Sequence, residues 1–121
     1  MGIAVPRLPN FWLCYGPNTN LGHGGSVIFQ SECQSRYISA CLVEMIERGI
    51  SAIDVRQKAH DDYIQKVDTE HEAMIWTHPG MTTYYRNKIG RVFSAMPWSF
   101  VDYWRMTHDP QLDDDYRQSF A

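Results

Sequence analysis

The sequence predicts an α/β protein, of α+β type for the isolated chain, because three kinds of segment follow one another. A short apolar run at 11–15 leads through a glycine-rich loop into a long stretch with helical periodicity. A second helical stretch comes next, followed by two short segments of β-forming residues around a turn. The expected order is a short buried strand, a glycine loop, a long helix, a second helix, a β-hairpin and a short C-terminal helix.

Length and composition place the chain among ordinary single domains. Its 121 residues are 44% hydrophobic and 13% aromatic, which is enough apolar surface for a packed core. A formal net charge of −3 with scattered basic residues offers no electrostatic surface for nucleic acid or for an acidic membrane. No apolar run approaches the roughly 20 residues that cross a bilayer, and the first residues lack the charged start of a secretion signal. We therefore expect a cytoplasmic protein.

The run 11–15, FWLCY, is almost wholly apolar and predicts a strand that is buried on both faces. The loop 16–26 that follows it, GPNTNLGHGGS, contains four glycines. Glycine adopts positive φ angles easily and lets the main chain approach a ligand closely. Two interpretations stay open on spacing alone: a loop that holds a ligand, and a tight strand-to-helix turn that holds nothing.

A long helix is predicted over 26–48. Ser26 is a suitable N-cap, Gly49 is a suitable stop, and Arg48 lies in the last turn, where the helix macrodipole favours a cation. Such a helix is about 34 Å long at 1.5 Å per residue. Its apolar stripe consists of Val27, Tyr37, Ile38, Cys41, Leu42, Met45 and Ile46. Alternation at 50–55 then predicts a short strand.

The second helix is predicted over 57–76, where a His-Pro-Gly sequence ends it. Segments 82–85 and 91–94 are expected to pair as a hairpin around a turn. A short helix at 99–107 begins at a serine cap, with Val101 and Trp104 on one side. The acidic residues after Pro110 are expected to be loosely held. The apolar stripe of the second helix is formed by Tyr63, Ile64, Val67, His71, Met74 and Ile75.

The candidates for chemistry are few. The five histidines are scattered, and those at positions 60 and 71 lie about 16 Å apart along one helix, too far to share a metal. No nucleophile motif and no CxxC pair occurs, so we expect no metal site and no catalytic residue. Cys14, Cys33 and Cys41 are expected to be reduced and buried.

Two further groups allow two interpretations each. Arg86 and Arg91 flank the expected hairpin turn, where they are suited to a phosphate or carboxylate or are an ordinary solvated pair. An aromatic group is suited to stacking on a ligand, but such groups more often form a core or a domain interface, which we favour. It consists of Trp76, Tyr84, Tyr85, Trp98, Tyr103 and Trp104.

Three segments in order resemble the C-terminal part of class B flavoprotein monooxygenases. They read PNFWLCYGPNTNLGHGGSVIFQSECQSRYI, WTHPGMTTYYRNKIGRV and PWSFVDYWRMTHDP. The resemblance is greatest to the Baeyer-Villiger and 4-hydroxyacetophenone monooxygenase-like group, and it covers the chain from about Gly2 to about Tyr116. It implies a partial FAD/NAD(P)-binding fold. In that fold 1–56 supplies the C-terminal strand, loop and helix of an FAD-binding domain, 57–108 is a helix-and-hairpin extension, and 109–121 is an acidic tail.

The resemblance also implies the cofactors FAD and NADP and the residues nearest them. In the family the long helix starts near the pyrimidine edge of the flavin, which corresponds here to Asn20, Leu21, Gly22, Gly24, Gly25 and Ser26. A tryptophan that lies near the nicotinamide cofactor in the family corresponds to Tyr84, and Asn87 belongs to the same stretch. This chain has tyrosine in place of that tryptophan.

The family's two GxGxxG motifs, its fingerprint motif and its catalytic arginine have no counterpart in the chain. We therefore expect a C-terminal fragment of an FAD- and NADPH-dependent monooxygenase that contributes part of the flavin site and does not catalyse alone. Its expected partner is the missing N-terminal FAD/NADP-binding portion, or a second copy through the apolar helix. The alternative is a non-catalytic binding or dimerisation module derived from such an enzyme. Ketone and heteroatom oxygenation stay equally open.

Overall fold

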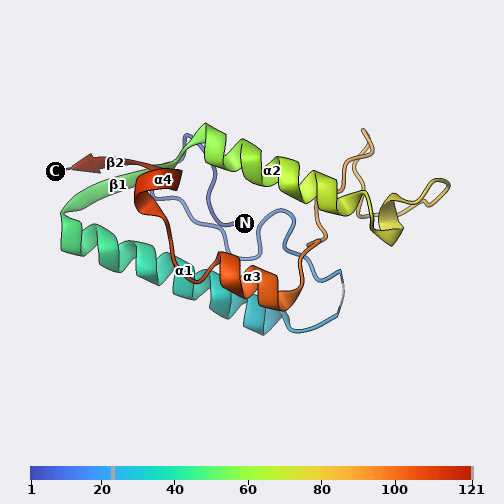
Figure 1. The fold of residues 1–121 in the computed structure, drawn as a ribbon, viewed down its shortest axis with the longest axis horizontal. Coiled ribbons are helices and arrows are strands. Elements are labelled where there is room, and N and C mark those ends of the chain that lie inside the picture. The colour runs from blue at the N-terminus through green and yellow to red at the C-terminus, as the bar shows by residue number, and fades with distance from the viewer. Residues whose placement is uncertain (23, 121) are drawn as a thin grey trace.

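The computed structural model describes residues 1–22 and 24–120, and two long helices set its shape (Figure 1). Helix α1 (Val27–Arg48) and helix α2 (Gln57–His71) run along opposite sides, with the N-terminal segment between them. Strands β1 (Ile50–Val55) and β2 (Tyr116–Phe120) lie at one end of the molecule. The remaining elements are the 3₁₀ helix η1 (Ile75–Thr77) and helices α3 (Phe100–Met106) and α4 (Leu112–Asp115).

Helix α1 confirms the predicted caps. The Ser26 hydroxyl accepts a hydrogen bond from the Phe29 N–H at 3.3 Å, and Gly49 ends the helix in a left-handed conformation with φ of 67°. The apolar stripe is only partly buried, because Tyr37 and Cys41 are fully enclosed while Leu42 and Ile46 are 45% and 80% exposed. One face of α1 therefore packs on the core and the opposite face remains open.

The prediction of a buried strand at 11–15 is wrong. Only Trp12 pairs, in an isolated antiparallel bridge with Ala4, and Phe11 and Tyr15 are 46% and 41% exposed. A strand buried on both faces needs a neighbour on each side, and the described residues provide one bridge. Asn10 and Tyr15, with φ of 55° and 57°, also turn the chain away from an extended path at each end of the run.

The prediction of a loosely held acidic tail is wrong as well. Strand β2 pairs antiparallel with β1, from Ile50 opposite Phe120 to Val55 opposite Tyr116. This pairing confirms the predicted strand β1 and supplies its hydrogen-bonding partner. Leu112 and Tyr116 are 2% and 3% exposed in the main core, so the end of the chain is anchored by apolar burial.

The second helix ends earlier than predicted, at His71 instead of residue 76. The Thr77 hydroxyl oxygen lies 2.6 Å from the carbonyl oxygens of both His71 and Met74 and shares its single proton between them, which stabilises a tight turn where the helix was expected to continue. The predicted hairpin is present in reduced form, with one antiparallel bridge between Arg86 and Val92 in place of two strands.

Helix α3 begins after Ser99, whose hydroxyl accepts from the Asp102 N–H at 3.1 Å, as the predicted cap requires. Its buried residue is Tyr103, while Val101 and Trp104 are 57% and 37% exposed. The side of this 7-residue helix that packs on the core is therefore the side of Tyr103.

The main core lies where α1, the two-stranded sheet and α4 meet. It consists of Ile3, Tyr37, Cys41, Met45, Ile50, Ile53, Leu112 and Tyr116. Among the described residues, no helix is long and apolar enough to cross a membrane. The division of the chain at residues 56 and 108 stays a prediction.

Candidate functional site

Within the glycine loop the chain pairs with a distant segment. Asn20 forms a parallel bridge with Ala95; its N–H donates to the Ser94 carbonyl, and its carbonyl accepts from the Met96 N–H, each at 2.8 Å. The Asn20 side-chain oxygen accepts from the Tyr15 hydroxyl at 2.5 Å. The loop is therefore fastened at its start to the segment that leads into α3.

Two of the three glycines at 22–25 are required by the chain's own aromatic rings. A Cβ on Gly22 would lie 2.5 Å from Cη2 of Trp76, and a Cβ on Gly25 would overlap the ring of Phe100. Gly24, with φ of 78°, faces open space. Internal packing thus explains Gly22 and Gly25, and only Gly24 leaves room for something outside the chain.

Beyond Gly24, helix α1 presents its N-terminus. Ser26 satisfies the Phe29 N–H, and its carbonyl accepts from the Gln30 N–H at 3.2 Å. The described residues supply no partner for the N–H groups of Val27 and Ile28, whose side chains are 41% and 72% exposed. Free N–H groups at the positive end of a helix attract an anion or an electron-rich edge of a ring system.

The resemblance implies that one edge of a flavin lies at this place. The donors at the start of α1 and the open backbone at Gly24 can meet the pyrimidine oxygen of an isoalloxazine ring. Leu21 is half-buried at the start of the same edge.

The two residues expected near a nicotinamide cofactor lie farther along the same end of the molecule. Tyr84 is 73% exposed and its ring centre lies 4.2 Å from that of Tyr85. Tyr85 in turn lies 5.7 Å from Trp76, which contacts Gly22. Tyr84 is therefore linked to the glycine loop through two intervening rings.

The side chain of Asn87 stabilises the hairpin turn. Its side-chain oxygen accepts from the N–H groups of Ile89 and Arg91 at 3.1 and 3.0 Å. Arg91 pairs with Asp68 of α2 at 3.0 Å, and the Nε of Arg86 donates to the Gly90 carbonyl. The hairpin arginines are thus engaged in holding the turn and fastening it to α2.

The predicted aromatic group separates into one series of three rings and separate contacts elsewhere. Trp76, Tyr85 and Tyr84 form one series, whereas the Trp98 indole N–H donates to the Tyr63 hydroxyl at 3.0 Å. Trp104 stacks on His108 at 4.6 Å. The group is not a single stacking platform.

A buried polar cluster beside the glycine loop was missed by sequence reasoning. Asn18 is 2% exposed, and its amide donates to the carbonyls of Val92 and Ala95 at 3.1 and 3.2 Å. His71 and Trp76 complete the cluster. The available signal was the asparagine in a Gly/Pro-rich loop, because asparagine tolerates the left-handed φ of 55° found here.

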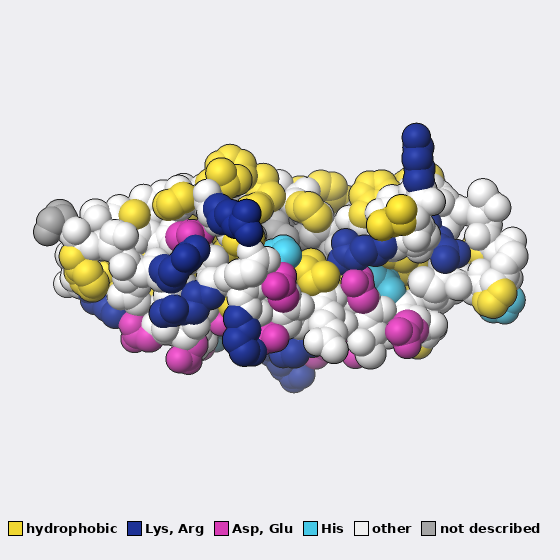
Figure 2. Space-filling model, turned by 90° about the horizontal axis from the view of Figure 1, so that it is seen from above, with side chains coloured by type: hydrophobic (Ala, Val, Ile, Leu, Met, Phe, Trp, Pro, Cys, Tyr) yellow, Lys and Arg dark blue, Asp and Glu magenta, His cyan; other side chains and the backbone are white. Residues whose placement is uncertain are grey.

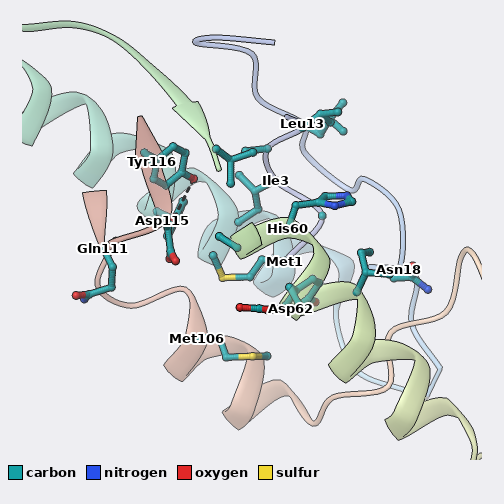
Figure 3. Close-up of a pocket in the computed structure, with 18 of the residues that line it drawn as sticks. Met1, Ile3, Leu13, Asn18, His60, Asp62, Met106, Gln111, Asp115 and Tyr116 are labelled. Atoms are coloured by element: carbon teal, nitrogen blue, oxygen red, sulfur yellow. Dashed lines mark hydrogen bonds between the residues drawn. The ribbon is translucent and has the colours of Figure 1, made fainter. Parts of the chain in front are cut away.

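A cavity of about 370 Å³ lies between the N-terminal segment, α2 and residues 106–116, and Pro17 and Asn18 of the glycine loop contribute to its lining (Figure 3). Apolar side chains such as Ile3 and Leu13 line it together with Asp115, whose carboxyl pKa is raised by burial. None of the residues expected near a cofactor lines this cavity. Among the described residues, no group of three or more His, Cys, Asp or Glu side chains could hold a metal.

Comparison with known proteins gives matches along almost the whole chain. An uncharacterized monooxygenase of Sinorhizobium fredii is 43% identical over 97% of this chain. A Baeyer-Villiger monooxygenase of Streptomyces coelicolor is 30% identical over 92% of this chain, and an FAD-binding monooxygenase of Aspergillus niger is 31% identical over 84%. No family model matches the chain.

The chain spans only about a fifth of the length of these relatives: 18%, 21% and 17%, respectively. The solved structure of an oxidized steroid monooxygenase bound to NADP superposes with a TM-score of 0.79 at 18% identity. It covers 99% of this chain and 23% of its own. This superposition confirms the α/β fold as part of a larger architecture.

Proposed function

Because the chain belongs to the family of FAD-binding and Baeyer-Villiger monooxygenases, we propose that it works as one part of an FAD- and NADPH-dependent monooxygenase. In this role it forms a rim of the flavin site and is inactive alone. One observation supports this proposal above the others: 97% of the chain matches a monooxygenase of which it makes up 18%.

The flavin rim is formed by the glycine loop and the first turn of α1. The N–H groups of Val27 and Ile28 would hold the pyrimidine edge, and Gly24 would leave space for its approach. Bound FAD would supply the redox chemistry there. Tyr84 lies exposed on the side expected to face NADP.

The partner in this proposal is the remaining four-fifths of the enzyme, and it docks on the open face of α1. That face carries Ile28, Leu42, Val43 and Ile46, which are 72%, 45%, 54% and 80% exposed. Apolar side chains in such a row are costly to leave in water. The relatives' additional length supplies the polypeptide that would cover them.

Co-production tests this function. The chain is made together with the part of the Sinorhizobium fredii relative that it does not match, and flavin absorbance and NADPH oxidation are measured. We expect colour and activity from the pair and neither from the chain alone. Tight stoichiometric flavin binding with turnover by the chain alone would refute the proposal, and a colourless pair would exclude assembly from separate polypeptides.

A matched pair of variants tests the docking face in the same experiment. Ile46→Lys places a charge on the open face of α1 and is expected to abolish association. Val101→Lys, at a 57% exposed position on α3, is expected to leave it unchanged. Equal effects of the two variants would show that the open face of α1 is not the contact.

The same exposed row on α1 supports the second candidate, a dimerisation module without redox function. Sedimentation of the chain separates the two, because a defined dimer without flavin favours the module. A cytoplasmic location is part of our proposal in either case, and cell fractionation tests it.

A further inference from the structure

A buried histidine, His71, is the last residue of α2 and lies near the glycine loop. His71 is 2% exposed, and its Nδ1 accepts a hydrogen bond of 2.9 Å from the indole N–H of Trp76. The two rings meet edge to face, 5.8 Å apart at 67°. Thr77 fixes the intervening turn through the His71 carbonyl, so the indole is held at a defined place.

The other side of the His71 ring faces Asn18, in the first part of the glycine loop. Its Nε2 lies 3.4 Å from the side-chain nitrogen of Asn18. The Asn18 amide is fastened to Val92 and Ala95, and its backbone N–H donates to the Phe93 carbonyl at 3.0 Å. Three segments far apart in sequence therefore meet around one imidazole.

Trp76 connects His71 to the glycine loop by direct contact. Its Cη2 occupies the place next to Gly22 where a Cβ would come within 2.5 Å, so backbone and ring are in direct contact. The path of the backbone at Gly22 depends on where the indole lies, because a close-packed contact allows little displacement. The position of the indole depends on an unprotonated acceptor at Nδ1 of His71.

We propose that His71 is a positioning residue for the flavin rim: through Nδ1 it holds Trp76 against Gly22 and so sets the course of the loop that leads to Gly24 and α1. His71 acts through Trp76 and needs no contact with the cofactor. The relevance to flavin rests on the proposed function, whereas the coupling from His71 to Gly22 is a property of the chain itself.

Two substitutions at position 71 distinguish a role as hydrogen-bond acceptor for Trp76 from a role that only fills space. In His71→Asn the amide oxygen can take the place of Nδ1 as an acceptor, whereas His71→Leu fills the site without one. Hydrogen exchange of the Trp76 indole N–H and the chemical shifts of the Gly22 and Gly24 amides are followed by NMR without flavin. In His71→Leu we expect the indole N–H to exchange roughly tenfold faster, the upper end of the effect of one neutral hydrogen bond, and both glycine resonances to shift.

In His71→Asn we expect exchange near the wild-type rate. Two internal references distinguish this local effect from unfolding: the Trp98 indole bonded to Tyr63, and the Gly49 amide bonded to Ile46. Unchanged glycine resonances in His71→Leu, equal behaviour of the two variants, or a wild-type Trp76 indole that exchanges freely would each overturn the proposal.

If the Gly49 amide also exchanges faster in His71→Leu, that variant has unfolded. Gly22→Ala then tests the same coupling with His71 intact. The added Cβ must displace the ring of Trp76, so faster exchange of its indole N–H is expected while the Trp98 indole stays unchanged. An unaffected Trp76 indole would overturn the coupling. Because none of these measurements uses FAD, a failure of flavin binding leaves their outcome readable.

Discussion

The hydroxyl groups of Tyr37 and Tyr116 lie 3.0 Å apart in the main core, where α1 meets β2. The two residues are 1% and 3% exposed, and burial raises the pKa of each hydroxyl well above its usual value. Both groups therefore stay protonated over the working pH range, and one donates to the other. This hydrogen bond joins the long helix to the last strand of the chain.

A double-mutant cycle measures this contact. We expect Tyr37→Phe and Tyr116→Phe each to lower the free energy of unfolding by about 1–2 kcal/mol, because each substitution leaves the buried hydroxyl of the other tyrosine without its hydrogen-bond partner. The double variant should cost less than the sum of the two, since it removes both polar groups. Urea denaturation gives all four values, and strict additivity would show that the two hydroxyls do not interact.

The glycine loop offers a comparison of two substitutions with the same chemistry. Gly24→Ala is strained only by its left-handed φ of 78° and should cost about 1–2 kcal/mol. Gly25→Ala, with φ of 112°, should cost a further ~1–3 kcal/mol, because the new methyl group overlaps Phe100. The free energies of unfolding of both variants test this. Equal losses would mean that the Phe100 ring moves aside freely.

Two carboxylates of α4 should affect stability in opposite directions. Hydrogen bonds from Arg48 and Gln118 lower the pKa of Asp113, whereas burial and the neighbouring Asp114 raise the pKa of Asp115. The charge of Asp113 therefore stabilises the fold above the usual aspartate pKa, and this contribution is lost as the pH falls through the lowered value. The charge of Asp115 destabilises the fold near neutral pH, and stability returns as the pH falls through the raised value.

Asp113→Asn is accordingly expected to unfold at lower urea concentration than the wild type at pH 7, and Asp115→Asn at higher concentration. Both differences should shrink at pH 3, where the two aspartates of the wild type approach or pass protonation. Because both residues lie partly or fully in solvent, the effects should be small. Two variants that shift the midpoint in the same direction at pH 7 would contradict this assignment of charges.

Local signals in the sequence were sufficient for α1, β1 and α3. Ser26, Gly49 and Ser99 are capping residues whose effect depends on a few neighbouring backbone groups, and these groups are present in any context. The inclusion of Tyr116 in a strand depends instead on pairing with β1, about sixty positions earlier in the chain. No local sequence pattern indicates such a long-range pairing. The run 11–15 was misassigned for the related reason that a doubly buried strand is defined by its neighbours.

The candidate site was predictable in part. A helix N-terminus behind glycines followed from the residues themselves, and the link to a flavin came from resemblance alone. The packing that requires glycine at positions 22 and 25 was not predictable, because the rings they contact, Trp76 and Phe100, lie more than fifty positions away in sequence. His71 was expected in an apolar stripe, and its hydrogen bond to Trp76 depends on the early end of α2, which the helical periodicity does not show.

The three free cysteines should differ sharply in reactivity. Cys14 is exposed, contrary to the expectation that all three are buried, whereas Cys33 and Cys41 are 3% and 0% exposed. Burial raises the pKa of the Cys33 thiol and raises that of Cys41 to about 12, which leaves little of the reactive thiolate at pH 8. In Ellman's assay we expect one thiol to react quickly in the native chain and all three in urea. Cys14→Ser should remove the fast phase, and a fast phase that survives this substitution would mean that α1 opens far enough to release its buried face.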